Sequence, residues 1–126
     1  PEPAAAERAP DPSNFRVTDS GLGIEDLVVG PGAEASAGQT LVVHYVGTLG
    51  SGARFDSSRD RGVPLGFSLG SGQMIPAWEE GLVGMRVGGL RRLVVPPHLA
   101  YGARGQPPAI PPDAILEFEI ELLEVR

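Results

Sequence analysis

The stretch Leu116-Glu117-Phe118-Glu119-Ile120-Glu121-Leu122, near the carboxyl end of the chain, alternates apolar and acidic residues without a break. Successive side chains of a β-strand point to opposite faces, so the apolar side chains share one face and the carboxylates share the other. Such an alternation is typical of an antiparallel sheet with one face on the core and one in water. The stretch therefore predicts a half-buried antiparallel strand with a solvated acidic face.

Several upstream segments predict further strands of the same sheet. In residues 41–49, Leu41, Val43 and Tyr45 fall on one face and His44 falls on the other. Segments that contain Gly and Pro, such as Gly30-Pro31-Gly32, separate the predicted strands and indicate turns. The other predicted strand segments are residues 24–29, a short piece at Phe55, residues 65–69 and residues 90–95.

One stretch predicts a helix. Pro76 suits a first helical turn, because the N–H that proline lacks would have no partner there. Trp78, Leu82 and Met85 then follow at helical spacing on one face, and either Gly84 or Gly88-Gly89 can end the helix. Five or six antiparallel strands and one short helix define an α+β protein, in which a twisted sheet has one face covered.

Composition is consistent with one small domain. The chain has 126 residues, of which 41% are hydrophobic, enough for a modest core. Its 18 glycines and 13 prolines are spread without a repeat, which indicates many turns. A formal net charge of −6 argues against a nucleic-acid partner, and no apolar run approaches the ~20 residues that a membrane-spanning helix needs.

Residues 1–20 are expected to form a flexible tail rich in Pro and Ala, followed by one domain over residues 21–126. Only Phe15 and Val17 offer apolar side chains in the second half of the tail. Such a tail can link a domain to an anchor or to another domain, or can lack a role. For the compartment, we expect an exported, periplasmic protein with this linker, and the cytoplasm is the alternative.

Several kinds of active site are not supported by the sequence. There is no cysteine, and the two histidines, His44 and His98, lie far apart, so a zinc site is not expected. No GxSxG nucleophile motif occurs. Gly70-Ser71-Gly72 resembles half of a phosphate-binding loop, but the lysine that should follow is missing. We therefore expect neither a cofactor nor a metal, and we expect the pair Arg91-Arg92 to form a solvated or salt-bridged edge.

The remaining motifs carry a resemblance to a known family. In order, they are VHYVG (43–47), FDSSRDR (55–61), MIPAWEEG (74–81), AYGARG (100–105) and AIPP (109–112). Together they closely resemble the FKBP-type peptidyl-prolyl cis/trans isomerases, the macrolide-binding immunophilins. The resemblance implies a half-barrel sheet wrapped around the short helix, in a monomer.

The resemblance also implies the function. It predicts a peptidyl-prolyl cis/trans isomerase that acts on X–Pro bonds of flexible or unfolded client chains, assists their folding, and binds macrolides such as rapamycin and tacrolimus. An apolar, aromatic pocket suits a reaction in which no bond is made or broken. The alternative is a non-catalytic module that holds proline segments, or a chaperone with the same pocket.

The resemblance assigns roles to individual side chains. Those given a catalytic role are Tyr45, Asp56, Trp78, Tyr101 and Phe118, with Trp78 as the pocket floor. The implied substrate-binding set is Tyr45, Phe55, Asp56, Arg61, Leu65, Phe67, Gln73, Met74, Ile75, Trp78, Tyr101, Gln106, Ala109, Ile110 and Phe118.

Each assignment has a structural alternative. Trp78 can be a core residue of a short helix, Phe67 and Phe118 can be mainly structural, and Asp56 can bond backbone N–H groups in an Asx-turn. The sequence also departs from the family pattern. Leu65 stands where many members have an aromatic residue and Ala109 where Ile or Val is common, so we expect thinner walls and weaker macrolide binding.

Overall fold

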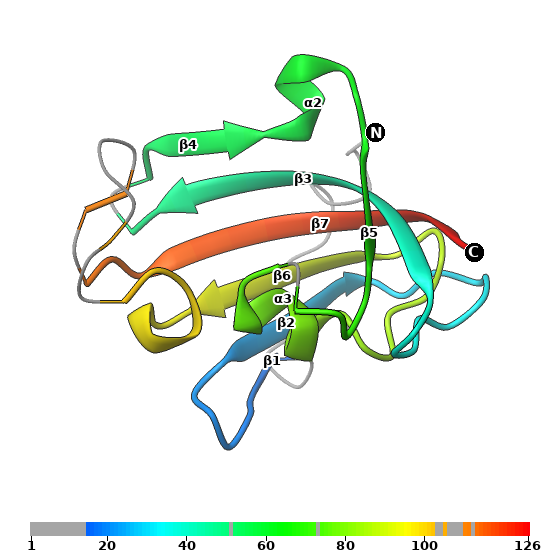
Figure 1. Ribbon diagram of the computed structural model, residues 1–126, viewed down its shortest axis with the longest axis horizontal. Helices are drawn as coiled ribbons and strands as arrows, with labels where there is room; N and C mark the ends of the chain where they lie inside the picture. Colours follow the sequence, from blue (N-terminus) through cyan, green and yellow to red (C-terminus); the bar gives the residue numbers. More distant parts are fainter. Residues whose placement is uncertain (1–14, 51, 73, 103–104, 106–109, 112) are drawn as a thin grey trace.

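The computed structural model describes residues 15–126, apart from 51, 73, 103–104, 106–109 and 112 (Figure 1). Its main element is a seven-stranded sheet in the order β1-β2-β6-β7-β3-β4, and β5 pairs with the first residues of β3, Thr40 to Val43. All of the pairings are antiparallel. The strands are β1 Phe15–Val17, β2 Gly23–Val28, β3 Thr40–Leu49, β4 Arg54–Ser57, β5 Leu65–Ser68, β6 Leu90–Val95 and β7 Leu116–Val125.

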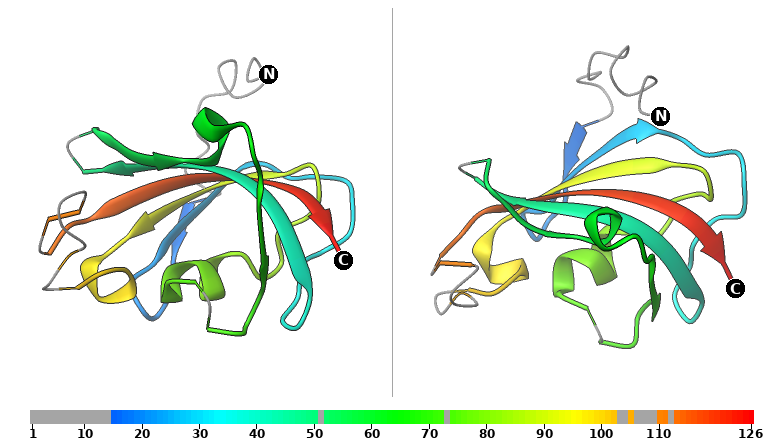
Figure 2. Two further views of the ribbon diagram at one scale, coloured as in Figure 1. Left: turned by 45° about the horizontal axis from the view of Figure 1, so that its top comes forward. Right: turned by 90° about the horizontal axis from the view of Figure 1, so that it is seen from above.

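The curved sheet wraps around the helix α3, Pro76–Gly81, which lies inside its concave side (Figure 2). The long central strands β3 and β7 pair along almost their whole length, from Leu41 opposite Val125 to Leu49 opposite Leu116. Their alternation is as predicted, because Leu116, Phe118, Ile120 and Leu122 are buried. The α+β class, and a half-barrel around a short helix, are thus confirmed.

The sequence-based prediction of the strands is wrong in one respect. The sheet has seven strands and not five or six, because β1 pairs with β2, Phe15 lying opposite Glu25. Phe15–Val17 lies within the predicted tail, so the ordered sheet begins before Gly21. The alternation Phe15-Arg16-Val17 is only three residues long and its side chains are exposed, so the pattern was too short to indicate a strand.

The prediction of a single helix also needs correction. Residues Ser58–Arg61 form a one-turn helix, α2, and Pro97–Leu99 form a 3-10 turn, η2. The ends of α2 are set by capping: the Ser57 hydroxyl accepts a hydrogen bond from the Asp60 N–H, and Gly62 follows with φ 71°. α3 begins at Pro76 as expected but ends at Gly81, before Gly84, although Leu82 and Met85 beyond it are still buried.

Candidate active site

The floor of the site is the indole ring of Trp78, which α3 presents to the concave face of the sheet. The side chain is almost completely buried, with 2% exposure. Its ring is nearly perpendicular to those of Tyr45 and Phe118, with centroid distances of 5.1 and 5.4 Å. Phe67 lies on another side at 5.7 Å. Trp78 is therefore a core residue that also lines the cavity, and its contact with a substrate stays a prediction.

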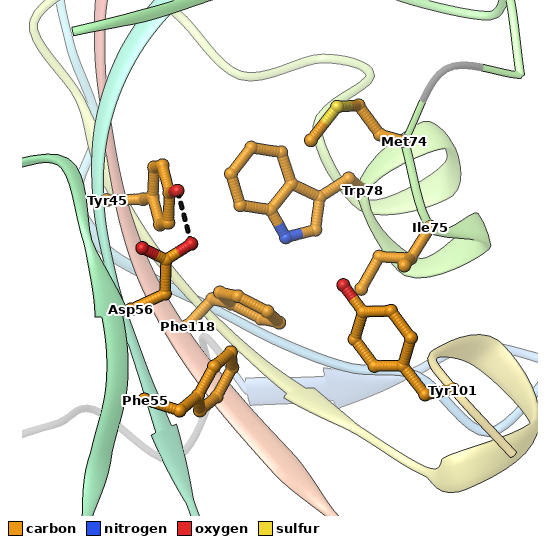
Figure 3. Close-up of a pocket in the computed structure, with 8 residues that line it drawn as sticks. All are labelled: Tyr45, Phe55, Asp56, Met74, Ile75, Trp78, Tyr101 and Phe118. Atoms are coloured by element: carbon orange, nitrogen blue, oxygen red, sulfur yellow. Dashed lines mark hydrogen bonds between the residues drawn. The ribbon is translucent and has the colours of Figure 1, made fainter. Parts of the chain in front are cut away.

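A cavity of about 320 Å³ opens above this floor (Figure 3). Its volume is at the lower end of the range for small-molecule sites, and suits a proline ring with its flanking peptide groups. The described residues that line it are Tyr45, Phe55, Asp56, Met74, Ile75, Trp78, Tyr101 and Phe118. Strands β3, β4 and β7 supply one side of the cavity, and α3 with its preceding loop and the turn after η2 supply the other.

One wall of the cavity is polar. The Tyr45 hydroxyl donates a hydrogen bond of 2.6 Å to Asp56 Oδ2. Arg61 donates from Nη1 to Asp56 Oδ1 and from Nη2 to the Tyr45 hydroxyl oxygen, the latter at 2.9 Å. The Ser57 N–H also donates to Asp56 Oδ1, at 2.9 Å. Asp56 thus bonds the backbone and lines the pocket at the same time, and its carboxylate is already committed to three donors.

The polar wall has fixed charges. Burial raises the pKa of Asp56, but hydrogen bonds from Tyr45 and Arg61 outweigh it, and the net pKa lies below its ordinary value. Burial, followed by the hydrogen bond to Asp56, raises the pKa of Tyr45. Burial, followed by the charge of Asp56, raises the pKa of Tyr101. The bonds to Asp56 and Tyr45 raise the pKa of Arg61. At neutral pH the wall therefore holds a carboxylate, a guanidinium and neutral phenols, none of them near its own pKa.

Ser58 helps to hold this wall, and the sequence analysis did not identify it. Its side chain is fully buried in the first turn of α2. Its Oγ accepts the Tyr45 N–H at 2.7 Å and pairs with His44 Nδ1 at 2.8 Å. Since the same short helix carries Arg61, these bonds attach α2 to β3 and bring Arg61 to Asp56. The motif FDSSRDR contained this residue, but nothing in its composition indicated burial.

Glu79 is a second side chain whose role was missed. It follows Trp78 in α3 and turns its carboxylate to the preceding loop, where it accepts the N–H groups of Gly70, Gly72 and Met74, at 3.0 Å from Gly72 and 3.2 Å from Met74. The Gly70-Ser71-Gly72 segment, which resembles half of a phosphate loop, thus binds a carboxylate of its own chain. This contact fixes the loop that brings Met74 and Ile75 to the cavity.

Gly47 allows two aromatic walls to meet over β3. A Cβ atom added at this position would lie 2.7 Å from Phe55 Cζ and 2.9 Å from Phe118 Cε1, closer than real Cβ contacts. The two rings themselves pack edge to face, with centroids 5.7 Å apart. The missing side chain therefore makes the space in which Phe55 and Phe118 form one wall.

Two residues at the rim, Tyr101 and Ile75, line the cavity. The Tyr101 hydroxyl points toward the cavity (Figure 3) and has no hydrogen-bond partner within the described part of the chain. Ile75 directly precedes α3, and its carbonyl accepts the Trp78 N–H at 3.0 Å. Both lie where the family resemblance places groups that contact a ligand carbonyl.

The other predicted site residues lie at the edge of the cavity or outside it. Phe67 packs against Trp78 but does not line the cavity. Arg61 supports the polar wall and is also outside the cavity lining. Leu65 is half-buried opposite Val43, and Ile110 is buried in the core; neither lines the cavity. Gln73, Gln106 and Ala109 lie outside the described residues.

No group of three or more His, Cys, Asp or Glu side chains that could hold a metal occurs in residues 15–126, leaving aside the gaps given above. Among the helices of that same part, none has the length and apolar character to cross a membrane.

Comparison with protein families agrees with this geometry. Residues 32–123 match the model of the FKBP-type peptidyl-prolyl cis-trans isomerases. The chain belongs to this family, and the resemblance seen in the sequence is confirmed. It is therefore a peptidyl-prolyl cis-trans isomerase.

Individual relatives are similar over most of the domain. The "FK506-binding protein" of Neisseria meningitidis serogroup B (strain ATCC BAA-335 / MC58) is 52% identical over 105 residues, which are 83% of this chain and 96% of the relative. The Drosophila melanogaster protein named "Peptidyl-prolyl cis-trans isomerase Fkbp12" is 43% identical over 108 residues, which are 83% of this chain and all (100%) of the relative.

Solved structures share the fold. The crystal structure of AtFKBP13 superposes with a TM-score of 0.84 at 44% identity and covers 89% of this chain and 98% of its own. That of FkpA from Escherichia coli gives a TM-score of 0.82 at 42% identity, covering 90% of this chain and 52% of its own.

Proposed function

We propose that this isomerase accelerates rotation about X–Pro bonds by holding the proline ring on Trp78 in a dry, aromatic pocket. We further propose that it acts on flexible or unfolded chains during folding, and that the same pocket binds macrolides of the rapamycin and tacrolimus type. The observation that carries the proposal is the buried indole floor of the cavity, enclosed by the rings of Tyr45, Phe118 and Phe67.

The chemistry explains why such a pocket is sufficient. Rotation about the peptide bond crosses a barrier of ~18–20 kcal/mol, which amide resonance sets. In the twisted transition state resonance is lost, and the carbonyl oxygen carries less negative charge than in the planar amide. Water therefore stabilises the planar ground state more than the twisted state. A pocket that removes water and fits the twisted geometry lowers the barrier without a nucleophile or a proton transfer.

The side chains divide this work between them. In our proposal the proline ring lies on Trp78, with Phe55, Met74 and Phe118 excluding water around it. The Ile75 N–H and the Tyr101 hydroxyl hold carbonyl groups of the bound segment. The Asp56 carboxylate keeps its three donors and gives the wall its shape and field without exchanging a proton.

Macrolide binding is supported by relatives that are named FK506-binding proteins. A macrolide that contains a proline-like ring and adjacent carbonyl groups would occupy the same cavity as the substrate. We therefore propose that it competes with proline peptides.

The test is a protease-coupled assay on a proline-containing peptide, run with and without rapamycin and after exhaustive chelation. We expect isomerase activity that rapamycin inhibits and that chelation leaves unchanged. Refolding of a protein limited by proline isomerisation, measured alongside suppression of aggregation, separates folding catalysis from passive binding. Suppressed aggregation without faster refolding would contradict the proposed folding role.

A further inference from the structure

Arg91 is a buried cation on the face of the sheet that covers α3. It lies on β6, where Arg91, Leu93 and Val95 are buried and alternate with the more exposed Arg92 and Val94. Only 6% of its side chain is exposed. From the sequence, a solvated or salt-bridged edge is expected here. The salt bridge is present, but burial shows that Arg91 belongs to the interior.

The guanidinium of Arg91 joins three elements. Its Nε donates to Asp26 Oδ1 at 2.6 Å, and Asp26 is the residue directly opposite on β2. Its Nη1 donates to the carbonyl of Gly81 at 2.8 Å and to that of Val83 at 3.2 Å. Gly81 is the last residue of α3. Arg91 therefore caps the carboxyl end of this helix, whose last carbonyls lack intrahelical partners and carry partial negative charge.

Trp78 lies on the same short helix whose end Arg91 caps. α3 has only six residues and no side-chain hydrogen bond at its amino end, and Trp78 lies less than one turn before Gly81. A displacement of the helix end would tilt or lift the indole relative to Tyr45 and Phe118. Glu79 anchors the loop on the amino-terminal side, so Arg91 supplies the corresponding anchor at the carboxyl end.

We propose that Arg91, oriented by Asp26, is a positioning residue of the isomerase site: it bonds the end of α3 to the sheet and thereby sets the position of the Trp78 floor. The inference rests on the proposed role of Trp78 as the surface that holds proline. This positioning role requires the planar, forked guanidinium of arginine, because one group must bond a carboxylate and two carbonyls in fixed directions.

Arg92 is the matched control for this proposal. It is the neighbouring arginine on the same strand, and it forms salt bridges with Glu25 at 2.8 Å and Glu117 at 3.3 Å. The Glu25 side chain is as buried as that of Arg91, with 5% exposure. Arg92→Met therefore also leaves a buried partner without its counter-ion, but it does not touch α3.

The experiment compares Arg91→Met, Arg92→Met and the parent chain at a temperature at which each is folded by circular dichroism. Two quantities are measured: kcat/KM on a proline peptide, and the native emission spectrum of Trp78, the one tryptophan in the sequence. For Arg91→Met we expect a loss of about tenfold in kcat/KM, since small misplacements of a site are costly, together with a shifted emission maximum. For Arg92→Met we expect both to match the parent.

Three results would overturn the proposal: a folded Arg91→Met with parental activity, a folded Arg91→Met with parental emission, or an equal loss of activity in both variants. If Arg91→Met does not fold, Arg91→Lys decides by the same readouts. Lysine keeps the positive charge beside Asp26 but lacks the forked guanidinium. Parental kcat/KM together with a parental emission spectrum would therefore refute the need for the fork. An inactive parent chain would count against the proposed function, while the emission spectra would still test the position of Trp78.

Discussion

The floor and the polar wall of the cavity are built on opposite principles. Trp78 at the floor makes its contacts through ring packing, and its Nε1 is the one buried side-chain nitrogen or oxygen without a hydrogen-bond partner among the described residues. In the wall, Tyr45, Asp56 and Arg61 satisfy one another by hydrogen bonds. The floor therefore supplies shape and excludes water, whereas the wall supplies a fixed electrostatic field. Neither part holds a group prepared to transfer a proton.

The largest effect is expected at the floor. Trp78→Ala should lower the free energy of unfolding by about 3–5 kcal/mol, because it deletes a large buried aromatic ring, and it should abolish measurable isomerase activity. Trp78→Leu should retain more stability and still bind rapamycin more weakly than the parent. Chemical denaturation and calorimetric titration measure these quantities. Parental rapamycin affinity in both variants would show that Trp78 is not the floor.

The junction between the walls comes next. Gly47→Ala places a methyl group against Phe55 and Phe118, and overpacking of this kind costs about 1–3 kcal/mol of stability. Because the displaced rings are the cavity wall, kcat/KM should fall as well. Gly66→Ala is the control: it lies in β5, and its Cβ would come no closer than 3.9 Å to Leu41 O. If the two variants behave alike, the close approach at Gly47 is not important for the site.

The polar wall should matter less than the floor. Asp56→Ala and Tyr101→Phe are each expected to lower kcat/KM by about tenfold, equivalent to ~1.4 kcal/mol of transition-state stabilisation, with the fold intact. Asp56→Ala also frees Tyr45 and Arg61 from their shared partner, so its effect should be the larger of the two. A loss of several orders of magnitude in a folded variant would mean that electrostatic or acid–base chemistry dominates. The polar wall would then contribute more to catalysis than the floor.

The sequence predicted the floor of the cavity better than the elements that hold the site in place, α2 and Arg91, for a physical reason. Trp78 and the alternating residues of β3 and β7 follow simple periodicities, which hydrophobic burial imposes on a helix or a strand. The short helix α2 follows from a serine cap and a glycine, which apolar periodicity does not register. Arg91 illustrates a further limit, because a charged residue on a strand gives no local sign of the carbonyls that will bury it.

Leu65 shows the limit of carrying over a family's residues one by one. Its position matched one that is often aromatic, so it was predicted to face the ligand. The structure instead places it on β5 opposite Val43, half-buried and outside the cavity lining. Opposite residues of antiparallel strands share a face, so Leu65 points to the same face as Val43; it lies outside the lining because β5 pairs with residues 40–43 of β3, before Tyr45. How far a short strand reaches along its neighbour cannot be read from its own four residues.

The central claim is that no protonation step limits the reaction, and the pH profile tests it most directly. The pKa of Asp56 is lowered, so the stability it contributes is present above its ordinary pKa and is lost only as the pH falls through the lowered value. The pKa values of Tyr45 and Tyr101 are raised, so their contribution is present below the ordinary tyrosine value and is lost as the pH rises through the raised ones. Between about pH 5 and 9, all three therefore keep one charge state.

The measurement is kcat/KM of the parent protein across this range, in H2O and in D2O, with the folded fraction checked at each pH. The histidines bond Ser58 and the Ser20 carbonyl and lie outside the cavity lining, so neither contacts the bound segment. We predict a profile that is flat within about twofold. The rates in H2O and D2O should be nearly equal, because no proton is transferred in the rate-limiting step. A bell-shaped profile with a large solvent isotope effect would contradict the account.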